Sequence, residues 1–187
     1  FKLNTDKKNV LIWGEQGVGD QILFLRFLKD IQPFVNKISI NIDKRLHPII
    51  ERFCPEIIIF NKEIHLNLDS QLSLGDLPYL FVKNSSYFLN NKNHYLSSDL
   101  NIKKKLEINV KSKNKFLCGV SWTSKAGEIG LNKSITLETL KPVLKIENVE
   151  FVDLQYTETS KERESFYNEN NIRIKKIDNI DNFNDLN

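Results

Sequence analysis

The chain has 187 residues, of which 40% are hydrophobic, and its 27 lysines and arginines stand against 24 acidic residues. This length suits one full domain and part of another, or two small domains. The longest apolar runs, such as residues 22–25 and 57–60, are far shorter than the roughly 20 residues that a membrane-spanning helix needs. The charge excess of +3 is spread along the chain, so the sequence excludes a transmembrane protein and gives no support for nucleic-acid binding.

The first part of the chain alternates predicted strands and helices. Residues 9–13, NVLIW, form a short continuous apolar run, which is typical of a strand buried on both faces. A helix is predicted over residues 20–31, with Asp20 at its start, where a carboxylate can cap free N–H groups. Further strands are predicted over 37–42 and 56–60, with a helix over 45–53. This order predicts a parallel sheet with helices on its faces, in the α/β class.

The second part repeats this alternation. Residues 61–98 are interpreted as loop with one short helix, and residues 101–112 as a charged amphipathic helix at the domain boundary. Strands are then predicted over 116–122, 150–155 and 172–177, with helices over 136–145 and 160–170. We therefore expect two domains, residues 1–112 and residues 113–187. The second is expected to be incomplete, and the chain to be a fragment.

The cysteines and histidines do not indicate a site of their own. Cys54 and Cys118 lie in apolar surroundings without a CxxC partner, so both are expected to be buried free thiols in a reducing compartment. His47, His65 and His94 stand singly, with no further ligand at metal-binding spacing. We expect no metal site.

The segment GEQGVGD, residues 14–20, lies between a predicted strand and a predicted helix. Its glycines permit positive φ angles and leave backbone N–H groups open to an anion or a sugar hydroxyl. It lacks the Lys-Ser/Thr pair of a P-loop and the glycine spacing of the dinucleotide fingerprint, although Asp43 past the second strand keeps nicotinamide binding open. Asp20 is either a structural helix cap or a catalytic base at the carboxyl end of the first strand.

A second candidate loop runs over residues 121–138, SWTSKAGEIGLNKSITLE. It offers Thr123, Ser124, Lys125 and Lys133 between a strand and the start of a helix. Lysines, small hydroxyl side chains and N–H donors together suit a diphosphate. The alternative is a solvated loop with ordinary surface lysines.

Taken together, these segments carry a family resemblance. The stretch WGEQGVGDQILFLRFL resembles the opening of the glycosyltransferase domain that follows tetratricopeptide repeats in many bacterial proteins, a relative of the lipopolysaccharide heptosyltransferases. Later segments are similar in order and spacing: LSLGDLPYLF, HYLSSD, GVSWTSKAG, NKSITLETLKPVL and FVDLQY. The resemblance covers nearly the whole chain.

This resemblance implies a GT-B architecture, with an N-terminal acceptor-side Rossmann-like domain and the first part of a C-terminal Rossmann-like domain that binds the nucleotide sugar. It implies an inverting, metal-independent transfer in which Asp20 is the general base, presented by the turn at Gly17 and Gly19. It assigns the donor diphosphate to Lys133, with Thr123 and Ser124 beside it. Lys125 falls where the family varies. Asp20 and Lys133 are expected to face each other across a cleft.

The expected function is thus transfer of a sugar from a nucleotide-sugar donor to a glycan, lipid-linked or protein acceptor. The alternatives are a non-catalytic interaction module that keeps the glycosyltransferase fold, and a nucleotide-dependent oxidoreductase. The donor is a substrate, so no cofactor is expected. The resemblance also implies upstream tetratricopeptide repeats and a location in the cytoplasm or at the inner face of the membrane. Because the family's donor site continues into a later segment, we expect this chain alone to have little or no activity.

Overall fold

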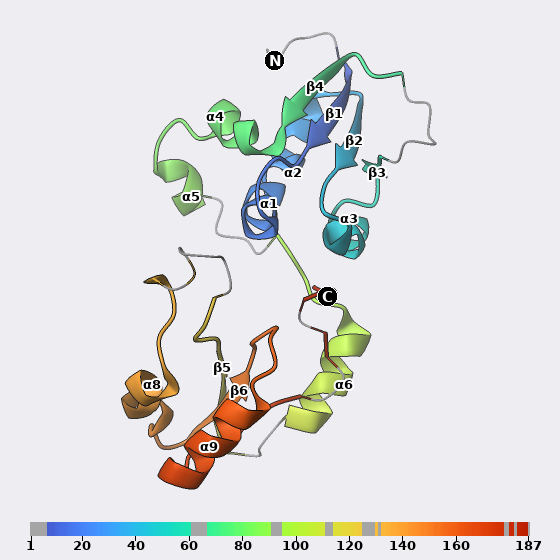
Figure 1. Cartoon of the computed structure of the whole chain (residues 1–187). Helices are drawn as coiled ribbons and strands as arrows, with labels where there is room; N and C mark the ends of the chain where they lie inside the picture. Colours follow the sequence, from blue (N-terminus) through green and yellow to red (C-terminus); the bar gives the residue numbers. More distant parts are fainter. Residues whose placement is uncertain are drawn as a thin grey trace. The chain divides into compact units, whose positions relative to one another are not determined.

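A computed structural model describes residues 7–60, 67–90, 95–110, 114–124, 130, 132–177, 180–181 and 183–186. They belong to two compact units, one of residues 1–98 with 186–187 and one of residues 99–185 (Figure 1). Each unit is built around its own parallel β-sheet, which confirms the predicted α/β class. Among the described helices, none is long and apolar enough to cross a bilayer.

The first unit contains a four-stranded parallel sheet in the order β3-β2-β1-β4. Its strands are β1 (Asn9–Trp13), β2 (Lys37–Asn41), β3 (Ile58–Ile59) and β4 (Ser70–Ser73). Strand β1 lies in the interior of the sheet, where Val10 pairs with Ile38 of β2 on one side and with Ser70 of β4 on the other. Val10 and Ile12 are fully buried, as the continuous apolar run of β1 predicts.

Strand β4 lies in a segment that was expected to be loop, and this expectation is wrong. Of its four residues, SQLS, Leu72 is the one apolar side chain; it is buried and pairs with Ile12. The segment forms a strand because it pairs with β1, whereas its own sequence has no hydrophobic pattern that would predict a strand. The chain then continues through a 3₁₀ turn η3 (Leu74–Asp76) and helices α4 (Leu77–Phe81) and α5 (Ser86–Asn90).

The helix expected over residues 20–31 forms as two helices, α1 (Val18–Leu25) and α2 (Leu28–Ile31). At the break, the backbone N–H of Phe27 donates to Phe24 three residues back, 3.0 Å away. The Phe27 ring is buried and stacks on Tyr87 of α5, with ring centroids 5.5 Å apart. The remaining elements of the unit are η1 (Gln32–Phe34), η2 (Lys44–Leu46) and α3 (His47–Phe53).

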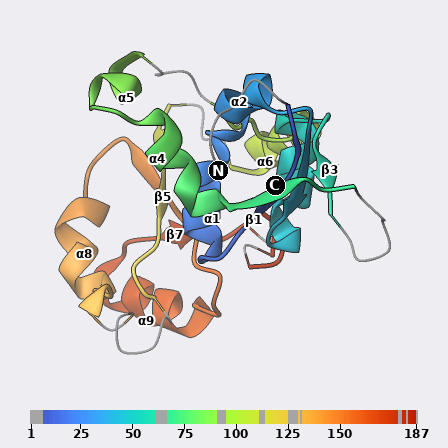
Figure 2. The same ribbon diagram turned by 90° about the horizontal axis from the view of Figure 1, so that it is seen from above.

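The second unit contains a three-stranded parallel sheet in the order β5-β6-β7. Its strands are β5 (Phe116–Val120), β6 (Val149–Asp153) and β7 (Ile174–Lys175), and its helices are α6 (Leu100–Val110), α8 (Leu137–Leu144) and α9 (Ser160–Asn170). Both crossovers step in the same direction, so right-handed connections place α8 and α9 on one face (Figure 2). The hydrophobic core of the second unit consists of the buried residues Trp122, Leu137, Leu144, Phe151, Phe166 and Ile174.

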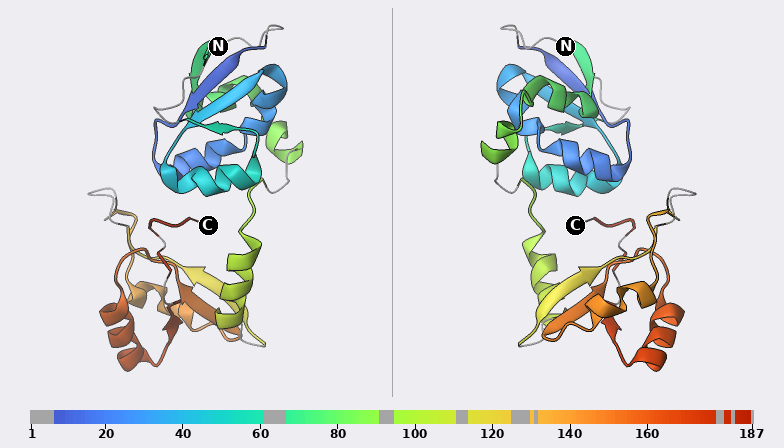
Figure 3. Two further views of the ribbon diagram at one scale, coloured as in Figure 1. Left: turned by 90° about the vertical axis from the view of Figure 1, so that its right-hand side faces the viewer. Right: turned by 90° about the vertical axis from the view of Figure 1, so that its left-hand side faces the viewer.

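Helix α6 groups with the second unit, whereas the sequence placed it at the end of the first. It lies on the side of the second sheet opposite to α8 and α9 (Figure 3). An amphipathic stripe indicates that a helix packs against something, but it does not tell which of two sheets that is.

Strand β5 forms within the predicted range 116–122, but the expectation that its Cys118 is buried is wrong. Within the described residues β5 pairs with β6 alone, and Phe116 and Leu117 are 80% and 55% exposed. Cys118 is exposed as well, because it lies on this edge strand. Cys54 is a buried free thiol as predicted, and burial, with a smaller effect of Glu56, raises its pKa to about 11.

Candidate functional site

In the first unit, the candidate site lies at the carboxyl ends of β1 and β4. The order of the strands reverses between these two neighbours, and ligands of open parallel sheets bind at such a point. Each strand is followed by a segment that carries a Gly-Asp pair: Gly19–Asp20 in the first turn of α1 after β1, and Gly75–Asp76 in η3 after β4. The two segments touch, because the Gly75 N–H donates to Glu15 Oε1 at 3.2 Å. Asp20 and Asp76 are both exposed.

The turn after β1 is held by the buried side chain of Gln21, which sequence reasoning missed. Its amide nitrogen donates to the carbonyl of Gln16 at 2.7 Å, and its amide oxygen accepts from the N–H of Asp43 at 2.9 Å. Gly14 allows this side chain to approach, since a Cβ there would come within 2.7 Å of the Gln21 Cδ. Gln21 therefore ties the exits of β1 and β2 together and fixes the backbone that leads to Asp20.

Asp20 is the third residue of α1, so the interpretation of its side chain as a helix cap is wrong. Gly17 occupies the N-cap position with φ −60° and ψ 159°, and no side chain caps this end. Neither Gly17 nor Gly19 adopts a positive φ, so the turn does not use their conformational freedom. A Cβ on Gly19 would meet nothing within 4 Å. Within the described residues the Asp20 carboxylate forms no hydrogen bond or ion pair, which leaves it open to a ligand.

Asp43 has a structural role at the start of η2. Its carboxylate accepts from the backbone N–H of Arg45 at 3.0 Å and from the guanidinium at 2.8 and 2.6 Å. These hydrogen bonds to Arg45 lower the pKa of Asp43 to about 2. A carboxylate occupied in this way is poorly placed to hold a ribose, so the geometry does not favour the nicotinamide alternative.

We expect the Asp43→Asn variant to be less stable than the wild type by about 1 kcal/mol at pH 7, after allowance for the partial exposure of the ion pair. Because folding lowers the pKa of Asp43, this stabilisation is complete above the unfolded value of 3.8 and is lost as the pH falls through about 2. Urea unfolding at pH 7, 4 and 2 measures the difference. The exposed Asp76→Asn serves as the control, and an Asp43→Asn effect that does not change with pH would contradict the charge assignment.

In the second unit, Gln155 organises the exit of β5. This side chain is 1% exposed and lies two residues after the end of β6. Its amide oxygen accepts from the Ser121 hydroxyl and from the N–H groups of Trp122 and Thr123, the latter two at 3.1 and 3.4 Å. Its amide nitrogen donates to the carbonyl and hydroxyl oxygens of Thr123.

The loop predicted to bind a diphosphate is closed at its base by hydrogen bonds. The N–H of Ile135 donates to the carbonyl of Trp122 at 2.9 Å, and the N–H of Ser124 donates to the Ser134 hydroxyl at 2.9 Å. These bonds bring Thr123 and Ser124 next to the segment that carries Lys133. Lys133 is exposed and forms no ion pair among the described residues. Lys125 lies outside the described residues.

Helix α8 begins directly after this loop. The Thr136 hydroxyl accepts from the N–H of Thr139 at 3.1 Å and caps the helix. The nearby Ser134 hydroxyl instead donates to the carbonyl of Gly130 at 2.7 Å and braces the loop.

A buried ion-pair cluster lies next to Gln155. The Asp153 side chain, at the end of β6, is fully buried and has Arg163 Nε at 3.1 Å and Lys176 Nζ at 3.5 Å. It also accepts from the Thr159 hydroxyl and from the Gln155 N–H. Lys176 donates in addition to the Gln155 carbonyl at 2.7 Å. The cluster therefore connects the ends of β6 and β7 to the start of α9.

The structure thus groups the candidate residues by unit. Gly17, Gly19 and Asp20 share one turn, and Thr123, Ser124 and Lys133 share one loop base. Sequence reasoning missed the residues that hold or extend these turns, namely Gln21, Asp76, Asp153 and Gln155. The repeated Gly-Asp pair was a signal for Asp76. Among the described residues, no group of three His, Cys, Asp or Glu side chains could hold a metal ion.

The fold and the two turns define a two-unit α/β protein with candidate binding loops at the carboxyl ends of parallel strands. Comparison with protein-family models, with curated proteins and with solved structures finds no match.

Proposed function

We propose that the protein is a glycosyltransferase of GT-B type, which transfers a sugar from a nucleotide-sugar donor to a hydroxyl of a glycan, lipid-linked or protein acceptor with inversion. The observation that carries this proposal is the exposed carboxylate of Asp20 at the carboxyl end of β1, at the point where the strand order reverses. A base at this point can reach an acceptor hydroxyl, and no described side chain competes for it.

The chemistry requires two kinds of group. A carboxylate takes the proton of the acceptor hydroxyl as its oxygen attacks the anomeric carbon, and the bond to the nucleoside diphosphate breaks on the opposite face. The leaving diphosphate gains charge, which cationic and N–H donors stabilise. Asp20 fits the first role, and Lys133, with the Thr123 and Ser124 hydroxyls, fits the second.

The experiment that tests donor binding is a thermal-shift titration, with ADP, GDP, UDP and dTDP, of a polypeptide that contains residues 1–187 and the later segment in which the donor site is expected to continue. At least one should raise the unfolding temperature, since a ligand at 100 times its Kd stabilises the folded state by about 2.7 kcal/mol. The Lys133→Gln substitution should raise the Kd of that nucleotide at least tenfold. Lys104→Gln, an exposed lysine of α6, is the matched control. If none of the nucleotides binds, or if both variants bind alike, the donor-site assignment is wrong.

A further inference from the structure

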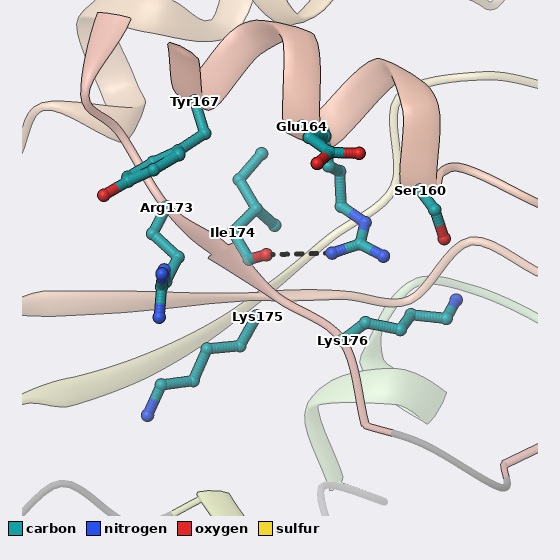
Figure 4. Close-up of a pocket in the computed structure, with 8 residues that line it drawn as sticks. Ser160, Glu164, Tyr167, Arg173, Ile174, Lys175 and Lys176 are labelled. Atoms are coloured by element: carbon teal, nitrogen blue, oxygen red, sulfur yellow. Dashed lines mark hydrogen bonds between the residues drawn. The ribbon is translucent and has the colours of Figure 1, made fainter.

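A hollow of about 420 Å³ opens between α9 and β7, outside the loops assigned above. Figure 4 shows Ser160, Glu164 and Tyr167 on the helix, and Arg173, Lys175 and Lys176 on the strand and its flanks; Ser160 and Lys176 lie at one end of the view, and Tyr167, Arg173 and Lys175 at the other. A second hollow of about 450 Å³ shares Arg173 and Lys175 and adds Lys115 and Lys145. These two shared side chains therefore lie where the hollows meet.

Positive charge exceeds negative charge in the first hollow. Its lining contains four cationic side chains, Arg163, Arg173, Lys175 and Lys176, and one carboxylate, Glu164. Asp153 is shared by Arg163 and Lys176, so it neutralises only one of them. Glu150 pairs with Lys175 at 2.6 Å. After these three carboxylates are set against the four cations, one positive charge remains.

Arg173 is the cation that supplies this excess. Among the described residues, no carboxylate lies within ion-pair distance of it. Its guanidinium carbon lies 5.2 Å from the centroid of the Tyr167 ring, a cation–π contact. Stacking uses the face of the guanidinium and leaves its N–H edge free, and that edge matches the paired oxygens of a phosphate.

We infer that this hollow binds the phosphate group of a small phosphorylated molecule, with Arg173 as the central donor. Lys175, which also lines the second hollow, lies at the same end of the hollow as Arg173. The space in the hollow exceeds that of a phosphate alone, so part of the attached molecule fits beside the Tyr167 ring. This site is separate from the donor loop of the proposed function, because it shares none of that loop's residues.

The test is a heteronuclear NMR titration of the 187-residue chain with inorganic phosphate and with glucose 6-phosphate at low ionic strength. We expect saturable shifts centred on the Arg173 Nε–H and on the amides of residues 174–176. The Arg173→Gln variant should raise the Kd at least fivefold, and Lys175→Gln at least threefold. Lys161→Gln, an exposed lysine of the same helix α9 outside the hollow, should leave it unchanged.

Shifts that do not saturate, or that spread evenly over the exposed lysines, would overturn the inference, and so would an unchanged Kd in a folded Arg173→Gln or Lys175→Gln variant. The Lys133→Gln variant separates the two proposals. It should lose nucleotide binding and keep the phosphate-induced shifts at β7, so either site can fail without the other.

Discussion

Replacement of Asp153 by alanine is expected to lower the free energy of unfolding by about 3 kcal/mol. The carboxylate is fully buried, while Arg163 and Lys176 are 18% and 24% exposed. Removing it leaves two largely buried cations without their counter-charge, and also frees the Thr159 hydroxyl and the Gln155 N–H. The expected loss in the free energy of unfolding is therefore larger than the loss from removing the same number of hydrogen bonds at the protein surface.

Urea unfolding followed by far-ultraviolet circular dichroism measures this loss. Glu147→Ala, which removes an exposed carboxylate before β6, is the control and should change the free energy by less than about 0.5 kcal/mol. Asp153→Asn keeps the side-chain volume and one acceptor oxygen, so its loss of unfolding free energy should lie between those of Asp153→Ala and Glu147→Ala. Equal stability of Asp153→Ala and Glu147→Ala would show that the cluster contributes nothing to folding.

The Asp20→Asn variant should lose about 100- to 10,000-fold in the rate of sugar transfer, the range that general-base catalysis contributes. Asparagine has nearly the same size, and the carboxylate has no partner among the described residues, so the fold and the binding of nucleoside diphosphate should not change. Release of nucleoside diphosphate from a nucleotide sugar, in any polypeptide that contains residues 1–187 and shows turnover, measures the rate.

Two matched variants make this prediction specific. Glu51→Gln removes an exposed carboxylate on α3 and should leave the rate unchanged. Asp76→Asn removes the carboxylate of the second Gly-Asp pair, and a loss as large as that of Asp20→Asn would assign the base to the turn after β4 instead. Full activity of Asp20→Asn would show that Asp20 is not the general base.

The parallel α/β architecture was predictable because β1 carries apolar residues without alternation, the pattern of a strand covered on both faces, and because predicted strands and helices alternate along the chain. Strand β4 was not predictable in this way. Its SQLS sequence is mostly polar, and it forms because β1 has an open edge beside it. Strand β5 shows the reverse, since its apolar FLCGV sequence indicates burial while Phe116 and Leu117 are exposed within the described residues.

The candidate loops were predictable from glycines and small hydroxyl residues between a strand and a helix, whereas the side chains that hold them were not. Gln21 and Gln155 are buried polar residues whose partners lie up to 34 positions away. Nothing local distinguishes either from an exposed glutamine, because only the folded sheet brings Asp43 or Ser121 into reach. Arg173 was missed for the same reason, since its sequence neighbours do not include the Tyr167 ring.

The hydrogen bonds of Gln155 have a consequence for how the second unit meets its ligand. Five polar groups of residues 121–123 are satisfied by one side chain before any ligand arrives. Binding therefore pays little conformational entropy at this segment, because its backbone is already ordered. Association should then be limited by diffusion and charge steering rather than by a slow rearrangement, with a single fast phase in stopped-flow mixing.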